Sequence, residues 1–212
     1  MDQEEARTRI LDAAERLFYA RGVQAVGMDE LRTTAGVSLK RLYQCFPAKD
    51  DLVEAYLRRR DTRWRAALAE YVEGRAGGPG ERPLAVFDWL HDWFAEPDFR
   101  GCAFLNSFGE LGATSDGVGR VAREHKRALL AYLTGLVRAL PVDGPDAVAG
   151  QLALLVDGAI TTAALTGDPA AARHARTAAG SLQAGGGPAR GSAPGRPPDP
   201  RGRISRTANR NK

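Results

Sequence analysis

The sequence predicts an all-α protein with a small N-terminal helix-turn-helix domain followed by a larger helical domain. Two observations predict this fold class. Apolar residues repeat at helical spacing in almost every periodic segment, and no convincing alternation of apolar and polar residues marks a strand. The stretch AGVSLKRLYQCFPAK (35–49) also places a glycine-containing turn between two short helical segments, which is typical of a helix-turn-helix.

Length and composition are those of an ordinary soluble globular protein. The chain has 212 residues, of which 43% are hydrophobic and 26% are charged, so it can bury a sizeable core. We find no apolar run approaching the ~20 residues of a membrane span, and the N-terminus lacks the basic start and apolar block of a secretory signal. The two cysteines are too few for a disulfide framework. A cytoplasmic protein without a membrane partner is therefore expected.

The basic character of the chain comes from its C-terminal end. Residues 183–212 hold seven Lys or Arg and one acid, a charge of +6, whereas the whole chain carries +4. The rest of the chain is therefore at −2, and its net charge is no argument for nucleic-acid binding.

The first third of the chain predicts four helices. Ile10, Ala14 and Phe18 lie on one face of the first, and Gly22 ends it. Ser38 is a good N-cap for the third, and Pro47 ends that segment. The predicted ranges are 4–21, 28–35, 39–45 and 49–73.

The remaining helices follow a Gly- and Pro-rich linker at 74–83. They are predicted at 84–96, 101–112, 116–140, 146–166 and 169–183. The low-complexity sequence after Gly185 predicts disorder. The expected division is a helix-turn-helix domain at 1–50, a second helical domain at 51–184, and a basic tail at 185–212.

The short helix after the turn has the chemistry of a recognition helix. Leu42 and Phe46 are four residues apart and face inward. The outward set is then Leu39, Lys40, Arg41, Tyr43, Gln44 and Cys45. Arg and Lys pair with guanine, Gln pairs with adenine, and Tyr or Lys can donate to phosphates.

The order ARTRILDAAERLFYARG, MDELRTTAGVS and LKRLYQCFPAKDDLVEAYL strongly resembles the N-terminal domain of TetR-family transcriptional regulators. The Ala-Gly-Val-Ser turn, the Leu-Tyr pair and the Phe-Pro-x-Lys-x-x-Leu segment carry the resemblance over about residues 4–60. Over 61–184 the resemblance is one of layout, an all-helical domain that dimerises and holds a small ligand. It implies a ligand-responsive regulator, and a repressor because most of the family repress.

The resemblance also implies a set of DNA contacts. Tyr43 and Lys49 match phosphate-contacting positions. The full set is Ser38, Leu39, Lys40, Arg41, Tyr43, Gln44 and Lys49. The departures from the family pattern are Gly27, which replaces a capping Ser or Thr, Cys45, and the acidic residues Asp29 and Glu30 near the expected DNA backbone.

An aromatic group at 84–112 predicts either a packed core or an apolar effector cavity. We expect the effector to be apolar or aromatic. The predicted ligand residues are Trp64, Trp89, Trp93, Cys102, Asn106, Phe108 and Asp157. His91, Glu110 and Thr161 are further polar candidates.

Cys102 carries an alternative hypothesis, that of a thiol-based electrophile or redox sensor. Arg100 lies two residues away and a helix is expected to begin nearby, and both features would lower the pKa of a thiol. Some TetR-like proteins that respond to electrophiles have a cysteine in a similar Gly-Cys setting. The other reading is a small buried apolar residue.

The helices at 146–166 and 169–183 are rich in small residues and are expected to form a four-helix dimer interface. A two-fold dimer would place two recognition helices about 34–36 Å apart on a palindromic operator. Motifs of an enzyme, a metal site or a cofactor site are missing from the sequence, so we expect no enzymatic activity and no cofactor. A non-specific DNA-packaging protein is a further alternative, because the basic tail would suit it.

Overall fold

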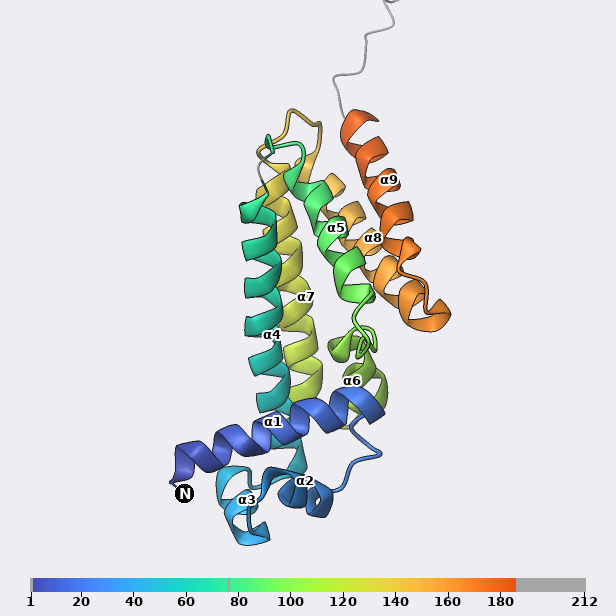
Figure 1. Cartoon of the computed structure of the whole chain (residues 1–212). Helices are drawn as coiled ribbons and strands as arrows, with labels where there is room; N and C mark the ends of the chain where they lie inside the picture. The colour runs from blue at the N-terminus through green and yellow to red at the C-terminus, as the bar shows by residue number, and fades with distance from the viewer. Residues whose placement is uncertain (1, 76, 186–212) are drawn as a thin grey trace, which may run out of the picture.

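The computed structural model describes residues 2–75 and 77–185. All regular secondary structure in this part of the chain is α-helical (Figure 1). The predicted fold class is confirmed. The helices are α1 (Gln3–Arg21), α2 (Met28–Ala35), α3 (Leu39–Cys45), α4 (Lys49–Gly74), α5 (Arg82–Phe94), α6 (Ala103–Leu111), α7 (Asp116–Val137), α8 (Pro145–Thr166) and α9 (Ala170–Gly185). The predicted ranges agree to within a few residues. The predicted tail lies outside the described residues, apart from Gly185.

The helices form two bodies joined by α4 (Figure 1). Helices α1 to α3 lie at one end, with α1 crossing the end of the bundle. Helix α4 begins beside α3 and runs along the bundle next to α7, against which it packs. Helices α5, α8 and α9 pack on one another on the other side. Any movement of α4 relative to the bundle therefore moves the N-terminal helices.

Local sequence fixes both ends of α1. The Asp2 carboxylate accepts a hydrogen bond of 2.7 Å from the backbone nitrogen of Glu5, which caps the first turn. At the other end, Gly22 adopts φ +85°, which an L side chain rarely allows. Ile10 and Phe18, about two turns apart on α1, are both buried.

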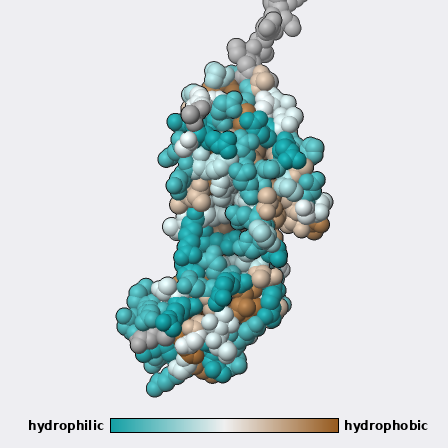
Figure 2. Space-filling model, viewed as in Figure 1, coloured by the Kyte–Doolittle hydropathy of each residue, from teal (hydrophilic) through white to brown (hydrophobic). Residues whose placement is uncertain are grey.

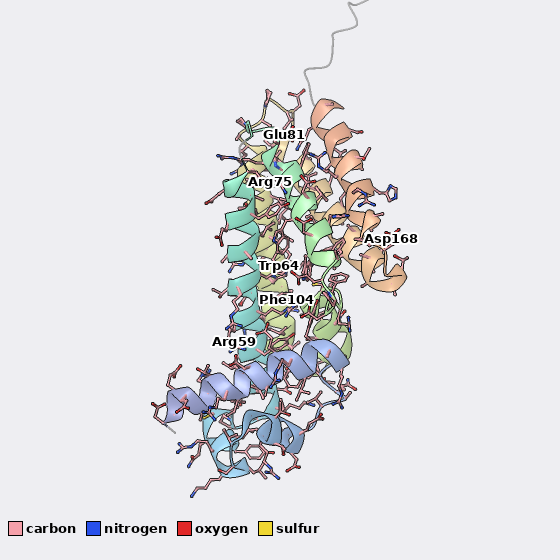
Figure 3. The ribbon with its side chains drawn as sticks, in the orientation of Figure 1. Arg59, Trp64, Arg75, Glu81, Phe104 and Asp168 are labelled. Atoms are coloured by element: carbon pink, nitrogen blue, oxygen red, sulfur yellow. The ribbon has the colours of Figure 1, made fainter. Side chains whose placement is uncertain are left out.

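A charge cluster holds α1 across α4. The Glu15 carboxylate of α1 lies 3.0 Å from the guanidinium of Arg59, 3.1 Å from that of Arg60 and 3.2 Å from that of Arg63. Figure 3 labels Arg59 where α4 passes α1. Because Glu15, Arg59 and Arg60 are largely buried, this network is worth more than an exposed pair and fixes the angle between the two helices.

Helix α8 corrects the expectation about apolar runs. Its 22 residues are long and apolar enough, by length and composition alone, to cross a membrane. The core helix of a soluble protein meets the same criteria, and α8 packs against α7 and α9. However, Leu154 and Leu165 are 74% and 83% exposed. Figure 2 shows a largely hydrophilic face with a hydrophobic patch near the turn between α8 and α9.

Candidate functional site

The turn between α2 and α3 is fixed by its own backbone. The Val37 nitrogen donates to the Arg32 carbonyl at 3.0 Å, and the Gly36 nitrogen donates to the Thr33 carbonyl at 3.2 Å. This is the hydrogen-bond pattern of a Schellman motif, which requires a left-handed residue, and Gly36 supplies it with φ +67°. The glycine therefore sets the angle at which α3 leaves α2.

Helix α3 packs one face against the core and exposes the opposite face, as predicted. The Ser38 hydroxyl accepts a hydrogen bond of 3.2 Å from the Arg41 nitrogen and caps the helix. Leu42 and Phe46 are buried at 0% and 1% exposure. The remaining outward residues form the reading face, which we define as Leu39, Lys40, Arg41, Tyr43 and Gln44. Four of them are exposed and Arg41 is half-buried.

Cys45 was wrongly expected to face outward, because the structure buries it at 8% exposure. Its sulfur lies 3.9 Å from the Gln3 carbonyl, and its own carbonyl accepts a hydrogen bond from Arg7. The start of α1 thus covers the last turn of α3. The sequence of α3 by itself gives no sign that the start of α1 covers Cys45.

The acidic residues of α2 are neutralised within the N-terminal domain. Asp29 pairs with Arg32 at 2.7 Å, and Glu30 pairs with Arg21. The negative charge near the expected DNA backbone is therefore compensated locally. Gly27 occupies the N-cap of α2, as predicted, without a side-chain cap.

Lys49 lies at the first position of α4, but its ammonium is turned toward the protein. Its Nζ donates a hydrogen bond of 2.7 Å to the Val23 carbonyl, and it lies 5.9 Å from the centre of the Phe18 ring. Burial lowers the pKa of the Lys49 ammonium below its usual value, although the nearby Glu110 carboxylate opposes this shift. Lys49 thus fixes the loop between α1 and α2.

The three tryptophans predicted for a ligand site form one packed cluster. The Trp64 ring lies 5.0 Å from that of Trp89 and 5.8 Å from that of Trp93, both edge-on. Figure 3 shows Trp64 in the interior of the bundle, near Phe104 of α6. The space between Trp64, Trp93, Cys102 and their neighbours is about 10 Å³, room for no more than about one water molecule, and we call it the closed cavity.

The other predicted ligand residues lie apart from one another. The Asn106 amide donates to the Arg100 carbonyl at 3.0 Å, and Asp157 pairs with Lys126. Phe108 is 45% exposed on the outside of α6. Only Cys102 joins the tryptophans around the closed cavity.

Cys102 shows one of the two features of an activated thiol. It is the N-cap residue of α6, as expected, but it is 7% exposed. The Arg100 guanidinium donates to the carbonyls of Pro97 and Phe99. The hydrogen bonds of the Arg100 guanidinium are therefore made within its own loop.

A buried histidine, not predicted as part of the site, forms the floor of the aromatic cluster. His125 stacks on the Phe104 ring at 3.7 Å and lies 2.7 Å from the Asp61 carboxylate through Nδ1. Burial lowers the pKa of His125 despite the Asp61 carboxylate, so the imidazole is neutral at pH 7. Burial raises the pKa of Asp61, but the bonds from Arg65 and His125 outweigh it and lower the pKa. The position of His125 among apolar residues of the α7 repeat was the available sequence signal.

Glu110, a further polar candidate from the sequence, connects α6 to the loop between α1 and α2. Its carboxylate accepts hydrogen bonds from the backbone nitrogens of Val23 at 3.1 Å and Gln24 at 2.7 Å. The Gln24 amide donates back to the Glu110 carbonyl at 2.6 Å. We call this group of bonds the α6 clamp. It joins α6 of the helical bundle to the loop that Lys49 also holds.

An open groove of about 380 Å³ lies between α6 and α7. Its apolar wall consists of Phe104, Leu105, Phe108 and Ala122. Its other wall is the cationic triplet, which we define as Arg123, Lys126 and Arg127. Of the predicted ligand residues, Phe108 alone lines this groove. Helical periodicity does not reveal the groove itself, because its walls come from two helices.

A helical bundle that presents a helix-turn-helix with an exposed second helix defines a class, the helix-turn-helix transcriptional regulators. Within this class the chain belongs to the TetR family. Residues 10–56 match the family model for bacterial regulatory proteins of the tetR family. A TetR-family transcriptional regulator from Streptomyces coelicolor has 32% sequence identity and a TM-score of 0.78, with 86% of this chain and 96% of that chain covered.

Curated relatives match part of the chain. An uncharacterised HTH-type transcriptional regulator from Mycobacterium tuberculosis is 45% identical over 83 residues, which is 37% of this chain and 39% of that protein. The transcriptional activator FasR from Mycolicibacterium smegmatis is 44% identical over 59 residues, 28% of this chain and 27% of that protein. The matches therefore span well under half the length of these relatives.

Proposed function

We propose that the protein is a dimeric, ligand-responsive transcriptional repressor of the bacterial cytoplasm that binds a palindromic operator. The single observation that carries this proposal is the reading face of α3. It presents two cations, an amide and a phenol while Leu42 and Phe46 hold the helix from behind. These groups match the donor and acceptor edges of the DNA major groove.

The proposed DNA contacts are the reading face together with Ser38 and Lys49. In this assignment residues 1–50 form the DNA-binding domain and residues 51–184 form the regulatory domain. Because α4 starts at Lys49 and continues to Gly74, it belongs to both and would transmit movement between them.

Dimerisation through α8 and α9 completes the proposed operator-binding unit. The exposed side chains of Leu154 and Leu165 lie about three turns apart on one face of α8, and a partner that covers this face would remove their apolar surface from water. A two-fold dimer would then address two half-sites one helical turn apart.

Ligand response is proposed to act by linkage. An effector can shift DNA affinity only through its different affinity for two conformers of the dimer. Operator DNA must then weaken effector binding by the same factor. The α6 clamp supports this proposal, because it joins the bundle directly to the N-terminal domain.

Selection from a random duplex library with the purified full-length chain tests the proposal. We expect an imperfect palindrome, bound about 10³-fold or more tightly than a scrambled duplex at moderate salt. Equal binding to scrambled duplex, with and without cell-extract metabolites, contradicts it. Deleting residues 185–212 separates a regulator, which keeps its preference, from a packaging protein, which loses most of its binding.

A further inference from the structure

We propose that the groove between α6 and α7 binds an amphipathic organic anion, whose acyl or aryl body lies on the apolar wall and whose carboxylate meets the cationic triplet. This inference rests on the proposed ligand-responsive function and gives the chemical class of the effector. The site is distinct from the closed cavity of the tryptophan cluster.

The size and the exposure of the groove fit a small amphipathic molecule. Its volume of about 380 Å³ lies in the range of small-molecule sites. Leu105 and Phe108 are 39% and 45% exposed on one turn of α6. Covering these side chains with an apolar body removes that surface from water, which favours binding.

The charge of the groove selects an anion. Arg123, Lys126 and Arg127 follow one another at i, i+3 and i+4, so they lie on one face of α7. Within residues 2–75 and 77–185, Arg123 and Arg127 have no carboxylate at ion-pair distance, whereas Lys126 pairs with Asp157. A guanidinium binds a carboxylate through two parallel hydrogen bonds. A cationic ligand would be repelled, and a neutral one would form weaker hydrogen bonds with the triplet than a carboxylate does.

Two side chains separate the groove from the closed cavity. Phe104 and Lys126 contribute to both spaces. Phe104 is held by its stack on His125, and Lys126 is held by Asp157. A bound carboxylate competes with Asp157 for the Lys126 ammonium, and a bound apolar body presses on Phe104. A ligand in the groove therefore contacts two side chains that also line the closed cavity.

The groove also lies on the helix that holds the N-terminal domain. Phe108 and Glu110 are two residues apart on α6, a helix of nine residues. A ligand that shifts α6 against α7 moves the Glu110 carboxylate relative to the Val23 and Gln24 nitrogens. Occupancy of the groove is thus coupled to the α6 clamp.

Calorimetric titration of the full-length chain with decanoate, below its micellar concentration, tests the site. The test variant is Arg123→Gln/Arg127→Gln. The control, Arg82→Gln/Arg138→Gln, removes the same charge from exposed positions outside the groove. We expect the test variant to weaken decanoate binding about tenfold or more and the control to stay within about twofold. Decanol and decyltrimethylammonium should bind the original chain at least about tenfold more weakly than decanoate.

Three results would overturn the inference. The first is decanoate affinity that does not change in the test variant. The second is equal binding of decanoate and decanol. The third is a change of oligomeric state on Phe108→Ser in sedimentation, with decanoate affinity unchanged, which would make the groove a protein interface.

Operator binding is measured separately, so the two proposals fail independently. If a selected operator is released by another compound and decanoate does not bind, the inference is wrong and the proposed function stands. If decanoate binds through the triplet and no operator is selected, the site stands and the proposed function is wrong.

Discussion

The carboxylate of Glu110 accepts a hydrogen bond of 2.7 Å from the backbone nitrogen of Gln24, although 86 residues separate them in the chain. A second oxygen of the same carboxylate receives the Val23 nitrogen. Two backbone donors of the loop between α1 and α2 are thereby satisfied by a side chain of α6. The loop is part of the N-terminal domain, and α6 is part of the bundle.

Glu110→Ala is expected to weaken the junction between the two domains. It removes a charged acceptor from two backbone donors, so we expect a loss of about 1–3 kcal/mol in the free energy of unfolding. Urea denaturation at fixed protein concentration measures it. Glu70→Ala, an exposed position on α4, serves as the control and should change stability by less than about 0.5 kcal/mol. Equal effects of the two variants would show that the α6 clamp contributes nothing.

The buried His125 gives a pH dependence of stability. Its pKa is lowered by burial, so the unfolded chain binds more protons than the folded chain as the pH falls below about 6.5. Stability from this group is therefore present above that pH and is lost as the pH falls toward the folded-state pKa. His125→Gln should flatten the slope of unfolding free energy against pH between about 5 and 7. Urea unfolding at a series of pH values measures this slope, and a slope that stays the same in His125→Gln would contradict the prediction.

Alanine substitutions of Gly36 and Gly135 should have opposite effects on the stability of the chain. A Cβ at Gly36 meets nothing within 4 Å, but the residue has φ +67°, so Gly36→Ala should cost about 1 kcal/mol through backbone strain alone. Gly135 is helical, exposed and equally uncrowded, and Gly135→Ala should stabilise the chain by up to about 1 kcal/mol. Thermal unfolding of both variants compares them. A stabilising Gly36→Ala would contradict the left-handed turn.

Lys49→Ala distinguishes two roles of this side chain. If the ammonium moves from the Val23 carbonyl to a phosphate, the variant should weaken operator and scrambled DNA alike and lower the salt slope by about one. We expect this result. Fluorescence anisotropy over a series of salt concentrations measures it, with Arg41→Ala as the comparison that should lose discrimination between sequences. An unchanged salt slope together with lower stability would assign Lys49 to the loop alone.

Leu154→Arg tests the proposed dimer surface of α8. The side chain is 74% exposed, so the change costs little in an isolated chain, but it would place an uncompensated charge inside the proposed interface. Sedimentation velocity at micromolar concentration should show a shift to monomer and loss of operator binding. Leu130→Arg, on α7, is the control. A dimer that persists in Leu154→Arg would place the interface elsewhere.

The sequence by itself determined the local structure. The ends of the first helices are short-range features: Gly22 ends α1, Gly36 ends α2, and Ser38 caps α3. The spacing of Leu42 and Phe46 is equally local. Each feature depends on residues within about one helical turn. They were therefore predictable, together with the helix ranges and the outward set on α3, except for Cys45. The TetR resemblance rested on the same local features.

The tertiary structure alone decided which side chains meet across the chain. Glu110 reaches Val23, His125 meets Asp61, and the start of α1 covers Cys45, and these pairs are 42 to 87 residues apart. Helical periodicity identifies the inward face of a helix but not the helix packed against it, because the same apolar stripe fits several partners. For that reason the aromatic residues could be predicted as buried, while the closed cavity and the open cationic groove depended on how α6 and α7 pack.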